Sequence, residues 1–200
     1  MLGRIHAVGA TRPFQHREAL GVQNFGHNSL NYLLDNNVIP RSLLPAYESV
    51  AKDLLKRVED VYAATPHQNI RMHGDCHPGN MMCRDEVFHI VDLDDCRMGP
   101  AVQDLWMMLA GDRHERLGQL AELVDGYQEF HDFNPRQLPL IEALRTLRLM
   151  HYSAWLARRW DDPAFPMSFP WFGTERYWGE QILVLREQLS ALQEEPLRLF

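Results

Sequence analysis

The sequence predicts an α+β domain that is mostly α-helical and carries one small β-hairpin. Apolar residues recur every three or four positions over most of the chain, which is the pattern of amphipathic helices. The only β-rich stretch lies between residues 70 and 91. The chain has 200 residues, of which 46% are hydrophobic, so it is long enough to bury a proper core. We therefore expect residues 1–200 to form a single domain.

Helices are predicted where the apolar spacing is helical and turn residues bound it. The longest begins at Arg41 and ends before Thr65-Pro66, because one face carries Leu43, Tyr47, Val50, Leu54, Val58 and Val61. Asn134 and Pro135 supply an N-cap and a favoured first-turn proline for a later helix. The proline- and aromatic-rich residues 161–173 are expected to cross the surface in extended form. The expected helices are 1–9, 29–34, 41–64, 102–111, 115–132, 135–160 and 174–193.

The hairpin is predicted from two short apolar segments, residues 81–83 and 87–91, joined by Arg84-Asp85-Glu86. A three-residue turn would place Cys83 opposite Val87 and Asn80 opposite Ile90. The residues that flank the hairpin would then emerge together at its open end.

Composition excludes several classes of function. The formal net charge of −7 and the pI near 5.8 argue against nucleic-acid partners, which need clustered Lys and Arg to neutralise phosphates. No apolar run is long enough for a signal peptide or a membrane span. We expect a soluble, cytoplasmic protein without a membrane partner. The 3 cysteines form no C-x-x-C pair, so we expect free thiols and no zinc site.

Charged and amide side chains are concentrated in HGDCHPGN, which begins at His73, and in VDLDD, which begins at Val91. Asp75 precedes Asn80 with the spacing of the kinase catalytic loop, H-R-D-x-x-x-x-N. In that motif the aspartate accepts the proton of the substrate hydroxyl and the asparagine binds metal. His73 takes the position of the motif's histidine, and Gly74 replaces its arginine.

Asn80 and Asp92 are predicted to bind one divalent cation. The predicted hairpin places Pro78 opposite Asp92, so that Asn80 and Asp92 lie at the same open end. Amide and carboxylate oxygens suit Mg²⁺, which takes few protein ligands and completes its shell with water and substrate phosphates. Asp94 is assigned a supporting role, either near the cation or in hydrogen bonds that shape the loop.

Further side chains are expected to support the catalytic loop. Asp104 lies in the first turns of an apolar helix, where its carboxylate would be buried. Because an unpaired buried charge is costly, we expect it to accept hydrogen bonds from nearby donors. The alternative is an exposed first-turn residue that the helix dipole favours. His73 is expected to be a buried, hydrogen-bonded support. For His77 two readings stay open, a place beside phosphate or substrate and an exposed position in the loop.

HGDCHPGN and VDLDDCRMGPAVQDLWMML together resemble the aminoglycoside and choline kinase-like superfamily, and within it the stress response kinase A family of bacterial serine/threonine protein kinases. The similarity continues through HYSAWLARRWDDPAFPMSFPW and QEEPLRL. It corresponds to roughly the last three-fifths of a family member.

The resemblance implies a protein-kinase-like C-terminal lobe in which Asp75 accepts the proton and Asn80 and Asp92 bind Mg²⁺. It also implies that ATP is the co-substrate. Asp104 would support the loop by accepting hydrogen bonds from backbone N–H groups near His73 to Asp75, as the equivalent aspartate does in kinase-like folds. The acceptor implied is a protein Ser or Thr hydroxyl.

The nucleotide-binding lobe of that family is expected to be absent from this chain. Lys52 and Lys56 are the only lysines, and both lie in the helix predicted at 41–64, so neither can be the strand lysine that pairs with the ATP phosphates. No G-x-G-x-x-G loop occurs. Because electrostatic positioning supplies most of the catalysis in phosphoryl transfer, we expect the chain alone to lose several powers of ten in rate.

Three alternatives stay open on the sequence alone. Asp75 would serve the hydroxyl of an aminoglycoside, choline or a sugar as well as that of a protein, so a small-molecule kinase is one alternative. A non-catalytic kinase-like fragment is another. A metal-dependent phosphoesterase would use ligands from His73, Asp75, His77 and Asp92, but it should need a dinuclear cluster with further His or Asp ligands.

Overall fold

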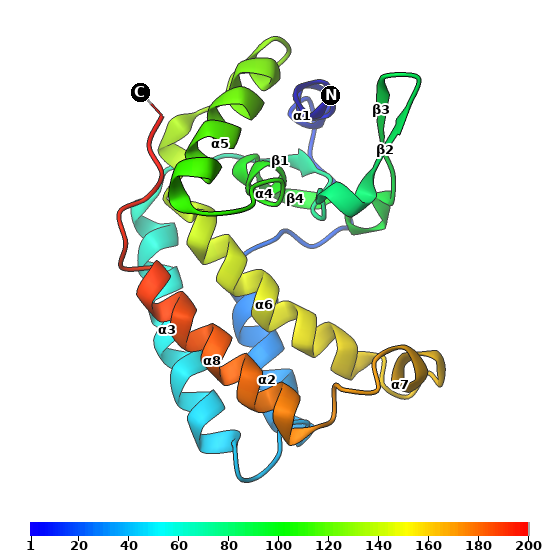
Figure 1. The fold of residues 1–200 in the computed structure, drawn as a ribbon, viewed down its shortest axis with the longest axis vertical. Coiled ribbons are helices and arrows are strands. Elements are labelled where there is room, and N and C mark those ends of the chain that lie inside the picture. Colours follow the sequence, from blue (N-terminus) through cyan, green and yellow to red (C-terminus); the bar gives the residue numbers. More distant parts are fainter. Residues whose placement is uncertain (200) are drawn as a thin grey trace. The chain divides into compact units, whose positions relative to one another are not determined.

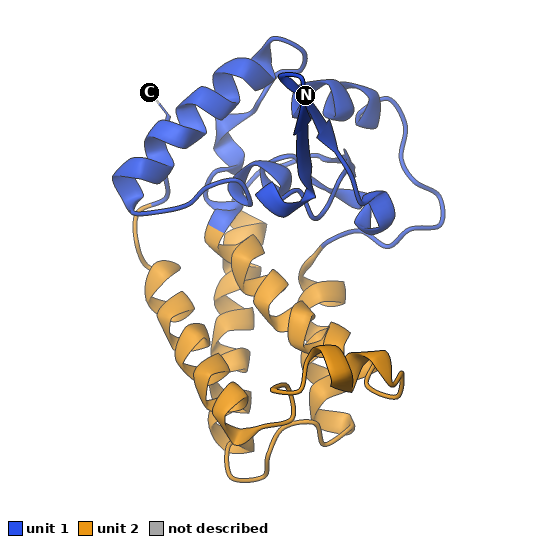
Figure 2. Ribbon diagram, turned by 45° about the vertical axis from the view of Figure 1, so that its right-hand side comes forward, with its two compact units in different colours: residues 1–20, 65–141, 196–200 blue, residues 21–64, 142–195 orange. Residues whose placement is uncertain are grey.

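The computed structural model describes residues 1–199 and divides into two compact units (Figure 2). Unit 1 contains residues 1–20 and 65–141 together with the C-terminal segment from Pro196. Unit 2 contains residues 21–64 and 142–195. Within the described residues, no helix is long and apolar enough to cross a membrane.

Unit 1 combines two small antiparallel sheets with helices and short 3₁₀ turns (Figure 1). One sheet pairs β1 with β4 and the other pairs β2 with β3. The elements are α1 (Leu2–Gly9), β1 (Asn69–Met72), a 3₁₀ turn (Pro78–Asn80), β2 (Met81–Arg84), β3 (Val87–Ile90), a 3₁₀ turn (Leu93–Asp95), β4 (Arg97–Pro100), α4 (Val102–Trp106), α5 (Arg113–Gln128) and a 3₁₀ turn (Pro135–Gln137).

Unit 2 is entirely helical apart from its loops (Figure 1). Its long helix α3 buries the predicted apolar face, on which Tyr47, Leu54 and Val58 are almost fully shielded from solvent. Tyr47 packs edge-on against Trp178 of α8. The elements are a π-helical segment (Val22–His27), α2 (Asn28–Asp35), α3 (Leu44–Ala64), α6 (Leu140–Arg158, which begins in unit 1), α7 (Ala164–Ser168) and α8 (Glu175–Ala191).

The predicted hairpin is present, but the predicted register is wrong by one residue. Cys83 lies opposite Phe88 rather than Val87, and the turn has two residues, Asp85 and Glu86. Both have positive φ angles, 51° and 62°, as in the two-residue turns whose twist matches that of the flanking strands. Asn80 therefore lies beside Val91, whose N–H donates to its carbonyl oxygen at 3.0 Å.

The structure contains a second small sheet that the sequence analysis did not predict. Residues Arg97–Pro100 form β4 and pair with β1, with Ile70 opposite Gly99. A short strand that contains Gly and Pro has little β-propensity of its own, so it forms only because it pairs with a distant segment.

Several helix boundaries also differ from those predicted. α4 ends at Trp106, and Gly111 has a φ of +87° just before Asp112, which caps α5 in a capping box with Glu115. Asn134 caps a 3₁₀ turn as expected, but α6 itself starts only at Leu140, after Pro139. The crossing predicted to be extended contains the short helix α7.

Candidate active site

The segment between β1 and β2 holds Asp75 and Asn80 together. The Asn80 side-chain Nδ2 donates to the Asp75 carbonyl oxygen at 3.0 Å and lies 3.5 Å from its carboxylate oxygen Oδ2. The Asp75 side chain is 18% exposed, so the carboxylate can still be reached from solvent. Because Nδ2 faces Asp75, the amide oxygen of Asn80 is the atom left to face a cation.

His73 is completely buried and joins the two halves of the predicted motif. Its Nε2 donates to the carbonyl oxygen of Val91 at 2.8 Å, and its Nδ1 accepts the backbone N–H of Asp75 at 3.3 Å. These bonds agree with one neutral tautomer, in which Nε2 carries the proton. The ring thus links the backbone of Asp75 to the residue that precedes Asp92. The geometry confirms the predicted buried, hydrogen-bonded histidine.

Gly74 allows the catalytic loop to pass close to the Asp92 segment. Its φ of +87° is favourable only for glycine, and a Cβ atom at this position would lie 2.4 Å from the carbonyl oxygen of Asp95. An arginine, as in the kinase motif, would not fit this backbone. The replacement noted in the sequence therefore has a local structural cause.

Two neighbouring side chains of α4 hold Gly74 and His73 from the buried side. The Asp104 carboxylate accepts the backbone N–H of His73 at 2.7 Å and that of Gly74 at 2.8 Å. Gln103 donates from Nε2 to the Gly74 carbonyl oxygen at 3.3 Å. Asp104 has no exposed surface, so its predicted burial and loop contacts are confirmed.

Two arginines shape the segment that carries Asp92 and Asp94. Arg17 donates from Nη1 to the carbonyl oxygens of Asp94 at 2.6 Å and Cys96 at 2.7 Å. Arg97 donates to the Asp95 carbonyl oxygen at 2.8 Å and pairs with the Asp95 carboxylate. The Asp92 backbone is left-handed, with a φ of 62°, and its side chain caps no helix. The carboxylates of Asp92 and Asp94 lie on the exposed surface of this segment.

The donor set at this end of the hairpin fits a hard divalent cation. Val91 is hydrogen-bonded to Asn80, so the neighbouring Asp92 begins at the open end of the hairpin, as predicted. One amide oxygen and one carboxylate suit Mg²⁺ when substrate phosphates and water complete the shell. Shared binding of one cation by both residues stays a prediction.

His77 approaches the Asp75 carboxylate. Its Nδ1 accepts the backbone N–H of Gly79 at 3.0 Å, which leaves the proton of the neutral ring on Nε2. Nε2 lies 3.6 Å from Oδ2 of Asp75, an electrostatic contact that is too long for a hydrogen bond. The His77 ring thus lies beside the Asp75 carboxylate and is partly exposed, and both readings of its role stay predictions. Among residues 1–199, no group of three or more His, Cys, Asp and Glu side chains could hold a metal ion.

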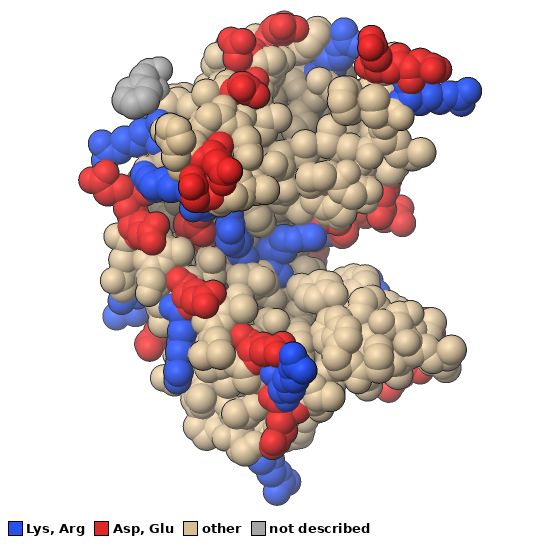
Figure 3. All heavy atoms as spheres, viewed as in Figure 1, with Lys and Arg blue, Asp and Glu red and all other residues tan. Residues whose placement is uncertain are grey.

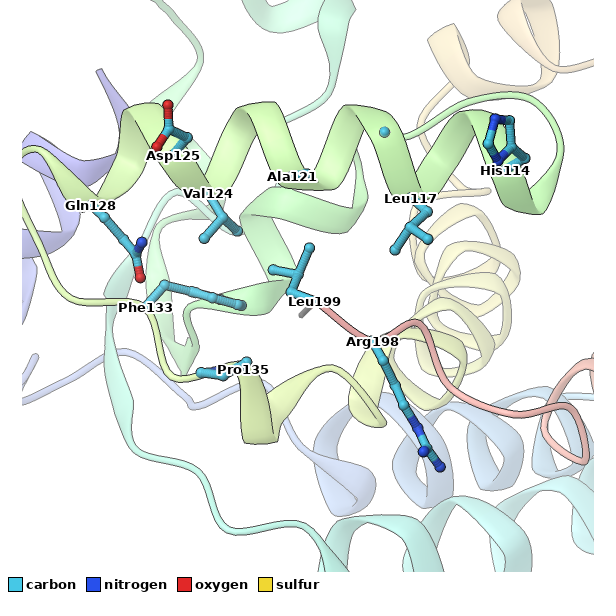
Figure 4. A pocket seen from close by; sticks show the side chains of 11 residues that line it. His114, Leu117, Ala121, Val124, Asp125, Gln128, Phe133, Pro135, Arg198 and Leu199 are labelled. Atoms are coloured by element: carbon cyan, nitrogen blue, oxygen red, sulfur yellow. The ribbon is translucent and has the colours of Figure 1, made fainter.

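Two hollows of unit 1 are lined by residues other than these. One, of ≈ 610 Å³, runs along α5 and is lined by Leu117 and Phe133, with Arg198 and Leu199 opposite (Figure 4). Another, of ≈ 250 Å³, lies behind the hairpin and is lined by Met81, among others. Neither contains a predicted catalytic or metal-binding residue.

The hairpin itself presents apolar side chains to solvent. Met82, Val87 and Phe88 are each more than half exposed. Charged residues gather at the tip, and the surface below it is largely uncharged (Figure 3). Such a patch is typical of a surface that another part of a protein covers.

Several residues that hold the loop in place were not predicted from the sequence. Gln103 precedes Asp104 in an apolar helix, and a buried amide there was a signal that could have been used. Arg17 lies in a stretch rich in loop residues, and nothing local indicated its partners. His6 contacts the Asp104 carboxylate through its ring, and Tyr127 contacts the other side of that ring, so nothing local in the sequence indicated either residue.

Stress response kinase A of Escherichia coli is 44% identical over 204 residues, covering 99% of this chain and 60% of that protein. Serine/threonine protein kinase RdoA of Salmonella typhimurium is 42% identical over 198 residues, with the same coverage of both chains. The chain thus spans about three-fifths of the length of these relatives.

Solved structures show the same fold at low identity. The amicoumacin kinase hAmiN, solved in complex with AMP-PNP, Ca²⁺ and Ami, matches with a TM-score of 0.65 at 16% identity over 100% of this chain and 58% of its own. A choline/ethanolamine kinase family protein from Mesorhizobium loti matches with a TM-score of 0.61 at 16% identity over 94% of this chain and 59% of its own. The predicted mostly helical, protein-kinase-like fold is confirmed. Residues 1–141 match the phosphotransferase enzyme family, and the chain belongs to that family.

Proposed function

We propose that residues 1–200 form the catalytic lobe of an ATP- and Mg²⁺-dependent protein kinase that transfers the γ-phosphoryl group to a Ser or Thr hydroxyl in the cytoplasm. The observation that carries the proposal is the hydrogen-bonded unit of His73, Asp75 and Asn80, which presents one carboxylate and one amide oxygen beside Asp92. This is the arrangement that phosphoryl transfer to a hydroxyl requires.

Asp75 acts as the proton acceptor in this proposal. The hydroxyl oxygen of the acceptor forms a bond to the γ-phosphorus while the bond from that phosphorus to the β–γ bridging oxygen breaks. The proton of the hydroxyl passes to a carboxylate oxygen of Asp75, and ADP leaves. His77 lies 3.6 Å from the same carboxylate and helps to orient it.

Asn80 and Asp92 would hold the cation, with Asp94 near it or shaping the loop. When bound, Mg²⁺ neutralises charge on the phosphates. Arg17 fixes the backbone of the Asp92 segment through two carbonyl oxygens, so these ligands stay aligned before substrate arrives. A preorganised charged site of this kind is the largest source of catalysis in phosphoryl transfer.

The nucleotide also needs contacts from outside this chain. Lys52 and Lys56 both lie on α3 in unit 2, so the lysine that pairs with the ATP phosphates in kinases has no counterpart here. We propose that a preceding lobe supplies these contacts. The exposed apolar side chains of the hairpin support this, because they form a surface that such a lobe could cover.

A protein acceptor is favoured over a small molecule by the closeness of the relatives. Those that are 42% to 44% identical are named as stress response or serine/threonine protein kinases. The structures that match at 16% identity, named as amicoumacin and choline/ethanolamine kinases, bear only on the fold. A small-molecule kinase nevertheless shares the chemistry of Asp75 and is the second candidate.

The test compares acceptors and protein lengths directly. This chain alone and a full-length form, in which the chain is extended to the length of its relatives, would be incubated with radiolabelled ATP and Mg²⁺. Myelin basic protein and casein serve as protein acceptors, and kanamycin, choline and glucosamine as small ones. We expect label in Ser or Thr of the proteins, only with the full-length form and only with a divalent cation. Label in a small molecule alone would replace the protein-kinase proposal by the second candidate, and no transfer at all would refute both.

A further inference from the structure

A fully buried histidine, His6, lies in α1 and takes no part in the proposed chemistry. Both of its ring nitrogens have partners in unit 1. Nε2 lies 2.8 Å from Oδ2 of Asp104, and Nδ1 lies 2.9 Å from the hydroxyl oxygen of Tyr127. His6 and Asp104 have no exposed surface, and Tyr127 is 2% exposed. Buried polar groups of this kind are costly unless every donor and acceptor is satisfied.

The direction of the bond to Asp104 follows from its carboxylate, which can only accept, so Nε2 of His6 carries the proton of that bond. Burial and the nearby Asp104 carboxylate raise the pKa of Tyr127, so its hydroxyl keeps its proton and is available to donate to Nδ1 of His6. Nε2 then donates to Oδ2 of Asp104. The chain of donors runs from Tyr127 through His6 to Asp104.

The same carboxylate anchors the catalytic loop. Oδ2 of Asp104 also accepts the backbone N–H of His73, and Oδ1 accepts that of Gly74. Three donors therefore hold one buried carboxylate, and two of them belong to the residues just before Asp75. Without His6, Oδ2 would lose one of its two partners and the carboxylate would be free to turn away from the loop.

The face of α1 that carries His6 is closely fitted to its surroundings. Gly3, His6 and Gly9 are the buried residues of this helix and are spaced three apart. A Cβ atom at Gly3 would lie 2.4 Å from the carbonyl oxygen of Tyr127, and one at Gly9 would lie 2.1 Å from that of Arg71. The two glycines let α1 approach α5 and β1 closely, which places the imidazole between Tyr127 and Asp104.

We propose that His6, oriented by Tyr127, is a positioning residue for Asp75, acting through Asp104 and the backbone of the catalytic loop. The expected effect on turnover rests on the proposed function, but the expected effect on the mobility of the loop does not. Loss of the His6 donor should loosen His73 and Gly74 while the binding surfaces for nucleotide and acceptor stay in place. Turnover should therefore fall with little change in KM.

The test uses matched variants and two independent measurements. His6→Leu removes the donor, His6→Gln restores one at a similar reach, and Tyr127→Phe removes a single hydroxyl. Tyr177→Phe is the control, because its buried hydroxyl is likewise bonded to a side chain, that of Ser153 at 2.8 Å, but in unit 2. Amide hydrogen exchange of residues 72–76 is measured in this chain, and kcat and KM are measured in the full-length form with ATP and myelin basic protein.

We expect His6→Leu to lower kcat by about 10- to 100-fold, with both KM values within about threefold of wild type. His6→Gln should recover most of that loss in kcat. The kcat of Tyr127→Phe should lie between those of His6→Leu and His6→Gln. Exchange of the His73 and Gly74 amides should become about tenfold faster in His6→Leu, with α8 unchanged. The Tyr177→Phe control should keep wild-type kcat and loop exchange.

Unchanged kcat and loop exchange in His6→Leu would overturn the inference. Equal losses in Tyr127→Phe and Tyr177→Phe would also overturn it, because they would indicate a general loss of stability. If His6→Leu does not fold, the comparison of the two tyrosine variants decides. If the wild-type full-length form transfers no phosphate, the proposed function fails, and loop exchange alone decides this inference.

Discussion

Replacing Asp104 with asparagine tests the buried support of the catalytic loop. Asparagine has the same shape, but it carries one acceptor and one donor where the carboxylate has two acceptors. If the amide oxygen stays near His73 and His6, the NH₂ group faces the backbone N–H of Gly74. In the wild-type chain that N–H donates to Oδ1 of Asp104 at 2.8 Å. Two donors then face each other in a site without solvent.

The cost can be worked out from these contacts. Loss of the Gly74 bond to a charged acceptor costs about 1.5–3 kcal/mol. The bonds from His73 and His6 weaken by about 1–2 kcal/mol together, because a neutral acceptor contributes roughly half as much as a carboxylate. Burying an amide instead of a charge offsets part of this loss. We expect a net loss of about 2–4 kcal/mol in the free energy of unfolding, or roughly 5–15 °C in Tm for a chain of this size.

Thermal and urea unfolding, followed by circular dichroism, measure this loss in the chain itself. Asp125→Asn is the matched control, since Asp125 is exposed on α5 and the same change there should alter stability by at most about 0.5 kcal/mol. The support would be refuted if Asp104→Asn lowered Tm no more than Asp125→Asn does.

Three further predictions concern single groups in the chain. Gly74→Ala should lower the free energy of unfolding in urea by about 1–3 kcal/mol, because its φ is +87° and a Cβ atom would clash with the Asp95 carbonyl oxygen. Gly118→Ala is the control and should not destabilise, because a Cβ atom there meets nothing. Equal effects of the two changes would argue against the close approach at Gly74. Cys76 should resist iodoacetamide at mildly alkaline pH while the exposed Cys83 is alkylated, as measured by peptide mass spectrometry. The reason is that burial, and to a smaller extent the Asp104 and Asp75 carboxylates, raise the pKa of the Cys76 thiol to about 12. Rapid labelling of folded Cys76 would contradict this. Burial also raises the pKa of Tyr127 and other buried tyrosines above the unfolded value of about 10. Their contribution to stability is therefore complete below about pH 10 and is lost as the pH rises further, so the free energy of unfolding should fall progressively above about pH 10. A flat profile at alkaline pH would count against this.

The catalytic loop could be predicted because its information is local. The spacing of His73, Asp75 and Asn80 predicts three roles within one short segment, and a carboxylate within an apolar helix must find donors. The resemblance to kinase-like folds then predicts that these donors belong to the loop. The apolar face of α3 could be predicted for the same reason, because its residues recur at helical spacing within one segment.

Contacts between distant segments could not be predicted. His6 and Asp104 are 98 residues apart, and a histidine in a short helix gives no sign of its partner. Strand β4 forms only by pairing with β1, and the hairpin register depended on a two-residue turn at Asp85-Glu86 with positive φ angles at residues that rarely adopt them. The spacing Gly3, His6, Gly9 was visible in the sequence, but its meaning required knowing what α1 packs against.

The most direct test of the account is the turnover of Asp75→Asn in the full-length form, measured beside its nucleotide affinity. Asparagine keeps the size of the side chain and cannot accept the hydroxyl proton. The account predicts that kcat falls by about 100-fold or more while the Kd for ATP with Mg²⁺ stays within about threefold of wild type. A kcat near that of the wild type would contradict the account, because Asp75 would then not be the proton acceptor.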